Sequence, residues 1–87
     1  MSEEIDINKL DLKMQKKGWI FLGPILHYKK ALKDQALVYK KNNEYIVFGI
    51  EKGENKTFKD KIEKNIAEKR VKESMIEISK HMLGSSL

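Results

Sequence analysis

The residue types that usually carry catalysis are few in this chain, and their spacing matches no catalytic arrangement. The two histidines, His27 and His81, stand alone and lie far from any metal-ligand spacing such as H-x-x-x-H. The serines lack the context of a nucleophile elbow. There is no cysteine, which excludes a disulfide, a thiolate nucleophile and a cysteine-based zinc site. The sequence therefore predicts no enzymatic activity, no cofactor and no metal site.

Lysine is the most abundant charged residue type in the sequence. The net charge of +5 is unevenly placed along the 87 residues. Residues 1–12 carry four acids and one lysine, residues 13–41 carry eight lysines and one aspartate, and residues 42–87 carry nine bases and eight acids. The middle segment therefore has a net charge of +7. Such a concentration of positive charge attracts polyanions, although a charge run can also be a simply solvated surface.

Nucleic acid, either DNA or RNA, is the partner that this basic segment predicts. Lysine contacts phosphate as a point charge and gives little base discrimination, for which arginine is better suited. Arg70 is the chain's one arginine, which also counts against the small ribonucleases. We expect salt-sensitive, weakly sequence-specific binding. The residues predicted to bind are Lys16, Lys17, Lys29, Lys30, Lys33, Lys40, Lys41 and, by stacking, Tyr28. Trp19 is either a further stacking residue or a core anchor.

The elements that would position these residues follow from local patterns. Residues 5–17 have helical apolar spacing and stop at Gly18, and the apolar run 19–22 indicates a buried strand. Two runs rich in Val, Ile, Tyr and Phe flank the polar residues 40–44 and predict a β-hairpin over 36–50. Residues 25–33 fit a short helix or an extended segment about equally well.

A long helix is predicted over residues 58–83. Thr57 and Asp60 have the spacing of a capping box, and Leu83-Gly84 is a typical stop. The helix would carry two apolar stripes that point about 140° apart. It could bend or break near residues 68–70, pack its halves on different partners, or be wrapped by the N-terminal helix. The second alternative predicts a protein interface at Val71, Met75, Ile78 and Met82.

The predicted fold class is α+β, formed by one small domain over residues 1–87. It comprises a short N-terminal helix, a small antiparallel sheet of two or three strands, and a long C-terminal helix packed on the sheet. The order helix, three strands, helix resembles that of the double-stranded-RNA-binding domain, with Gly23-Pro24 and His27 in the first loop. The spacing to His27 is one residue longer than in that family, and residues 57–61 lack its lysine cluster. The resemblance therefore concerns element order alone.

The sequence also limits the cellular location and the functional class that we expect. The longest apolar run, residues 19–26, is far shorter than the roughly 20 residues of a spanning helix, and the acidic N-terminus does not resemble a signal peptide. We expect a cytoplasmic, non-enzymatic regulatory protein without membrane contact. Two function classes remain open at this stage: nucleic-acid binding, and protein binding as a homodimeric adaptor or a small inhibitor of a larger partner.

Overall fold

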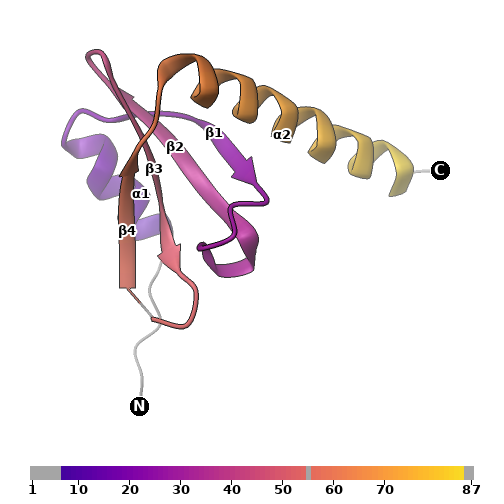
Figure 1. Cartoon of the computed structure of the whole chain (residues 1–87), viewed down its shortest axis with the longest axis horizontal. Coiled ribbons are helices and arrows are strands. Elements are labelled where there is room, and N and C mark those ends of the chain that lie inside the picture. The colour runs from indigo at the N-terminus through magenta and orange to yellow at the C-terminus, as the bar shows by residue number, and fades with distance from the viewer. Residues whose placement is uncertain (1–6, 55, 86–87) are drawn as a thin grey trace.

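A computed structural model describes residues 7–54 and 56–85 of the chain. Helix α1 (Ile7–Lys16) is followed by strand β1 (Ile20–Leu26), a 3₁₀ turn, η1 (Leu32–Asp34), and strands β2 (Gln35–Lys41), β3 (Glu44–Glu51) and β4 (Lys56–Lys61). Helix α2 (Lys64–Ser85) completes the fold (Figure 1). The predicted α+β class, with a short N-terminal helix and a long C-terminal helix packed on an antiparallel sheet, is confirmed.

The sheet is a four-stranded antiparallel meander in the order β1-β2-β3-β4. The predicted hairpin is present, with β2 and β3 joined at Asn42-Asn43 and Lys41 paired with Glu44. Asn42 has a positive φ of 55°, a conformation that asparagine tolerates better than most residues. The expected number of two or three strands was too low, because residues 56–61 form β4 instead of the start of the last helix.

Both faces of the sheet are covered, and each has its own core. On the α2 side the buried cluster includes Ile25, Val38, Tyr45, Val47 and Phe58. On the α1 side it consists of Met14, Trp19, Tyr39, Ile46 and Phe48. Because successive strand residues point to opposite faces, the run Tyr45 to Phe48 supplies both cores alternately and is buried throughout. The continuous apolar sequence of β3 follows from its place between two helical layers.

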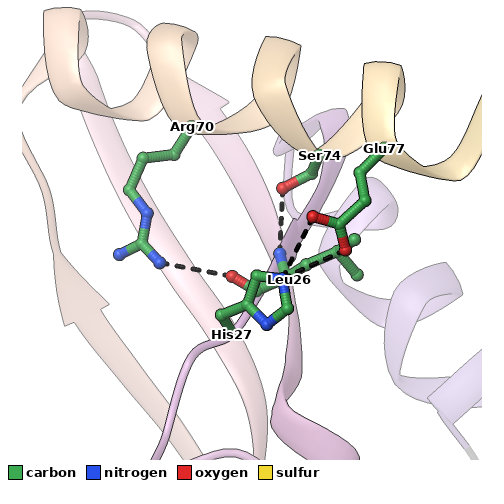
Figure 2. A network of polar contacts seen from close by, with 5 residues as sticks. All are labelled: Leu26, His27, Arg70, Ser74 and Glu77. Atoms are coloured by element: carbon green, nitrogen blue, oxygen red, sulfur yellow. Dashed lines mark hydrogen bonds and ion pairs between the residues drawn. The ribbon is translucent and has the colours of Figure 1, made fainter.

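Helix α2 packs beside β1 and covers the C-terminal part of its free edge. A Cβ placed on Gly23 would lie 2.6 Å from Cγ1 of Val71, so glycine permits this close approach. At the end of β1, the Leu26 amide donates to the Ser74 hydroxyl at 2.9 Å, and Arg70 donates to the Leu26 carbonyl at 3.2 Å (Figure 2). These side chains take the place of a neighbouring strand and satisfy an otherwise open edge.

The predicted helix over 58–83 began too early. The first of the two predicted apolar stripes consisted of Phe58, Ile62 and Ile66. Because Phe58 belongs to β4 and Ile62 follows that strand, only Ile66 lies on the helix. The helix from Lys64 runs without interruption through residues 68–70, so the alternative of a break there was wrong. The alternative of wrapping by the N-terminal helix was also wrong, because α1 packs on the opposite face of the sheet from α2.

Three further predictions concern residues 5–33. The strand predicted over 19–22 is present as β1, displaced toward the C-terminus and extended to Leu26. Residues 25–33 are not a short helix: Ile25 and Leu26 end β1, and only a single 3₁₀ turn follows. Of the predicted helix over 5–17, residues 7–16 are helical, and residues 5 and 6 lie outside the described part. Neither described helix has the length and apolarity needed to cross a membrane.

Candidate functional site

The lysines predicted to form one basic face lie in two groups at opposite ends of β2. Lys40 and Lys41 end this strand at the β2–β3 turn, whereas Lys29, Lys30 and Lys33 precede its first residue, Gln35. A strand of seven residues spans about 20 Å. We call the two regions the hairpin end and the loop end of the sheet, the loop end comprising residues 27–34 and 51–54. The order of these lysines along the chain concealed their separation.

Both helices and the other three strands also have residues at the hairpin end. Ile20 of β1 is paired with Lys40, Ile46 of β3 is paired with Lys61 of β4, and the Ile62 amide donates to the Tyr45 carbonyl just before α2 begins. Helix α1 ends here as well, immediately before Gly18 and Trp19. The lysines gathered at this end are Lys16, Lys17, Lys40, Lys41, Lys59, Lys61 and Lys64.

Aromatic rings hold three of these lysines in place. The ammonium groups of Lys41 and Lys59 lie 5.7 and 5.6 Å from the centroid of the Trp19 ring, and that of Lys40 lies 5.7 Å from the Tyr45 ring. A cation over an aromatic face is attracted by the negative charge of the ring's π-system. Trp19 itself is only 9% exposed. It is therefore the core anchor that the sequence left open, and it positions charges without presenting its ring to solvent.

The charges at the two ends of the sheet are balanced differently. At the loop end, Lys30 forms an ion pair with Asp60 at 2.9 Å and Lys52 one with Asp34 at 2.8 Å. At the hairpin end the seven lysines lie near three acids, Glu44, Asp60 and Glu63, which leaves a net charge of +4, and the Asp60 carboxylate is already paired with Lys30. Within the described residues, none of these seven lysines has a carboxylate partner within ion-pair distance. The uncompensated charge is therefore concentrated at one end.

Hydrogen bonds from lysine lower the pKa values of two carboxyl groups, Asp60 and Asp34. The pKa of the Asp60 carboxyl lies below its usual value, chiefly because Lys30 donates a hydrogen bond to it, and the Tyr28 hydroxyl donates a second at 2.9 Å. The pKa of Asp34 is likewise lowered, first by its hydrogen bond with Lys52. Both carboxylates are thus stabilised in their charged form, and Lys30 and Lys52 are already engaged within the protein.

Tyr28 was predicted to stack on bases, but its ring is already in contact on the inside of the protein. It stacks on Phe58 with centroids 5.7 Å apart and planes 7° apart, and the Arg70 guanidinium lies 5.8 Å from its centroid. Burial, assisted by the hydrogen bond to Asp60, raises the pKa of Tyr28 to about 12. Tyr28 thus joins the loop end to β4 and α2.

The four predicted interface residues on α2 have different environments. Val71 packs against Gly23 and the core of this same chain. Met75 is 49% exposed and Met82 is 67% exposed, while Ile78 is half-buried. The C-terminal part of α2 extends past the edge of the sheet (Figure 1). Val71 therefore packs inside the chain, whereas Met75 and Met82 lie at the surface.

An open hollow of about 410 Å³ lies between this part of α2 and the loop end. The ring of His27 contacts the Glu77 carboxylate at 3.0 Å on one side of it (Figure 2), and His81 and Lys33 are also in its wall. His27, Lys33 and Asp34 all have positive φ. No three histidine, aspartate or glutamate side chains in the described parts of the chain are arranged to hold a metal ion.

The sequence missed the contribution of Lys59, Lys61 and Lys64 to the hairpin end, because residues 58–64 were assigned to a helix. Alternation around Phe58 was the available signal, since Lys59 and Lys61 fall on the strand face opposite to it. Comparisons of the chain with protein-family models, curated proteins and solved structures found no match.

Proposed function

We propose that this protein binds nucleic acid through the hairpin end of its sheet. The observation that carries the proposal is the contrast between the two ends: two of the four lysines at the loop end, Lys30 and Lys52, are paired with acids, whereas none of the seven at the hairpin end has a carboxylate partner among the described residues. Unpaired lysines release condensed counterions when they contact phosphates, which supplies binding free energy without base recognition. The N-terminus of α2 at the same end adds the positive pole of a helix dipole.

We expect binding with little sequence specificity and a strong dependence on the salt concentration. Lysine supplies charge but not the bidentate base contacts of arginine, and Arg70 is committed to the Leu26 carbonyl away from the hairpin end. Non-specific affinities of this kind are typically about 10⁻⁴ to 10⁻⁶ M at physiological salt. The proposal makes the protein a non-enzymatic, cytoplasmic nucleic-acid-associated protein.

Matched charge reversals test this proposal. Lys40→Glu with Lys41→Glu reverses two charges at the hairpin end, and Lys29→Glu with Lys33→Glu reverses two exposed charges at the loop end. Fluorescence anisotropy with labelled DNA and RNA, over a range of salt concentrations, measures the affinity of each variant. We expect the first pair to abolish measurable binding and to flatten the salt dependence, while the second pair has a small effect. Equal losses for both pairs, or no binding by the unmodified chain, would contradict the proposal.

Self-association is a second candidate function, favoured by the exposure of Met75 and Met82 on the part of α2 beyond the sheet. With Ile78 they have the i, i+3, i+7 spacing of a seam between two helices. The proposed partner is a second copy of the chain, whose α2 would supply the same stripe. Light scattering gives the molar mass, and Met75→Lys with Met82→Lys should convert a dimer to a monomer. A monomeric mass for the unmodified chain at high concentration rejects this candidate.

A further inference from the structure

Phe21 is an aromatic side chain on the surface of the hairpin end. It is 45% exposed and lies on β1, an edge strand of the sheet. Its ring contacts that of Tyr39, with centroids 5.6 Å apart and planes at 56°. Tyr39 is fully buried and belongs to the α1-side core, so it supports the Phe21 ring from within the protein. Phe21 is thus held by the core while much of its ring faces solvent.

The position of Phe21 relative to the lysines follows from the strand register. Phe21 pairs with Tyr39, and the side chains of Trp19 and Lys41 lie two residues further along the same two strands. Residues two apart on a strand point to the same face. Phe21 and Lys41 are therefore diagonal neighbours on the α1 side of the sheet. Ile20, between Trp19 and Phe21, is 61% exposed on the other face, which extends the apolar surface around this edge.

Among the Phe, Tyr and Trp side chains of the described residues, Phe21 is the one that is exposed. The other Phe, Tyr and Trp rings are buried or covered: Trp19, Tyr39, Tyr45, Phe48 and Phe58 belong to the two cores, and Tyr28 lies between Phe58 and Arg70. The remaining large exposed apolar side chains are aliphatic. An exposed ring thus occurs at the end of the sheet where the lysines have no acidic partner among the described residues.

We propose that the ligand of the hairpin end is a single-stranded nucleic acid, with one base stacked on Phe21 and the adjacent phosphates near Lys41. This inference rests on the proposed function and narrows its ligand class. In a duplex the bases are stacked on one another and their faces cannot reach a protein ring. In a single strand each base has a free π-face, and stacking on an aromatic side chain adds affinity with little sequence preference.

The test compares single-stranded and duplex oligonucleotides of about 12 nucleotides, within the usual site size of single-strand-binding folds. Labelled polythymidine, polyuridine and a mixed-sequence DNA duplex serve as probes in fluorescence anisotropy. The variants are Phe21→Ala, Phe21→Trp and, as a matched control, Leu32→Ala. Leu32 is 46% exposed and lies at the loop end, so it equals Phe21 in exposure but not in position.

We expect the single strands to bind more tightly than the duplex. Phe21→Ala should weaken single-strand binding by about five- to a hundredfold, the range for losing one stacked base, and should leave duplex binding unchanged. Phe21→Trp should retain or strengthen single-strand binding, and it serves as the decisive variant if the alanine substitution unfolds the chain. Leu32→Ala should match the unmodified protein.

The outcomes separate this inference from the proposed function. If single strands and duplex bind equally, or if loss of the ring has no effect while Lys40→Glu with Lys41→Glu still abolishes binding, the stacking inference is wrong and the proposed function stands. If none of the probes binds, both are wrong.

Discussion

The Leu26 amide donates a hydrogen bond of 2.9 Å to the Ser74 hydroxyl, although the two residues are 48 positions apart in the chain. Leu26 is at the end of β1, where the sheet has no further strand to pair with. Ser74 is only 6% exposed, so the bond is protected from water. Two residues earlier on the same edge, Pro24 has no amide hydrogen to leave unpaired. Together these features close one end of the open edge and hold α2 against the sheet.

Ser74→Ala should lower the free energy of unfolding by about 1–3 kcal/mol, because it leaves the Leu26 amide without an acceptor in a buried position. Urea denaturation followed by circular dichroism measures this change. Ser79→Ala is the matched control, since Ser79 is on the exposed side of the same helix and should tolerate the substitution. Equal stabilities for the two variants would show that the contact does not hold the helix in place.

Gly23→Ala should destabilise the protein because its new Cβ would lie 2.6 Å from Cγ1 of Val71. Overpacking of this kind typically costs about 1–3 kcal/mol. Val71→Ala removes the opposing methyl group, so Gly23→Ala should cost less in that background than in the unmodified chain. The backbone strain of placing alanine at the positive φ of Gly23, 154°, is the same in both backgrounds. A double-mutant cycle measured by urea denaturation gives this coupling free energy. Additive effects of the two substitutions would contradict the close packing of α2 on β1.

Local sequence was enough to predict the hairpin and the two terminal helices, but not β4. In the hairpin, β-forming residues and an asparagine turn agree with each other and with burial on both faces. In β4, Phe58 is the one fully buried side chain, and lysines occupy the opposite face. Its sequence therefore fits a strand and a helix equally well, and the capping-box spacing of Thr57 and Asp60 favoured the wrong alternative.

The arrangement of the lysines could not be predicted for a different reason. It depends on which strand ends meet, and hence on the sheet order and on the chain reversal at residues 27–34. That reversal uses positive φ at His27, Lys33 and Asp34, where no glycine signals an unusual backbone conformation. The sequence therefore showed that the middle segment is basic, but not that its charges are divided between two ends of the sheet.

Acid should destabilise the protein partly through Asp60. The pKa of this carboxyl is lowered in the folded state by the hydrogen bond from Lys30, so its contribution is present above the unfolded pKa, about 3.9, and is lost as the pH falls through the lower folded value. Asp60→Asn should make the urea midpoint less sensitive to pH in this acidic range. Parallel curves for the variant and the unmodified chain would exclude this contribution.

Alkali should destabilise the protein through Tyr28. Its pKa is raised to about 12, chiefly by burial, so its contribution is complete below pH about 10, the unfolded value, and is lost as the pH rises toward 12. A titration followed by phenolate absorbance should show a tyrosine signal that ionises late in the folded protein. Tyr28→Phe should remove part of that late signal. An unchanged titration curve in this variant would contradict the assignment.

Trp19 should contribute to stability and not to direct contact with the ligand. Its ring is 9% exposed and lies between the α1-side core and the ammonium groups of Lys41 and Lys59. Trp19→Phe removes part of a buried ring and should lower the free energy of unfolding by about 1–3 kcal/mol. Because phenylalanine still fills most of the site beneath the two lysines, the affinity for single-stranded oligonucleotides should stay close to that of the unmodified chain.

Trp19 and Phe21 are two residues apart and lie on the same side of the sheet, so Trp19→Phe and Phe21→Ala compare a buried and an exposed ring in one region. The exposed ring should govern affinity, and the buried ring should govern stability. Urea denaturation and fluorescence anisotropy on the same protein samples measure the two quantities separately. If Trp19→Phe reduces affinity as strongly as Phe21→Ala while the variant remains folded, the indole takes part in binding, and the assignment of Trp19 to the core alone is wrong.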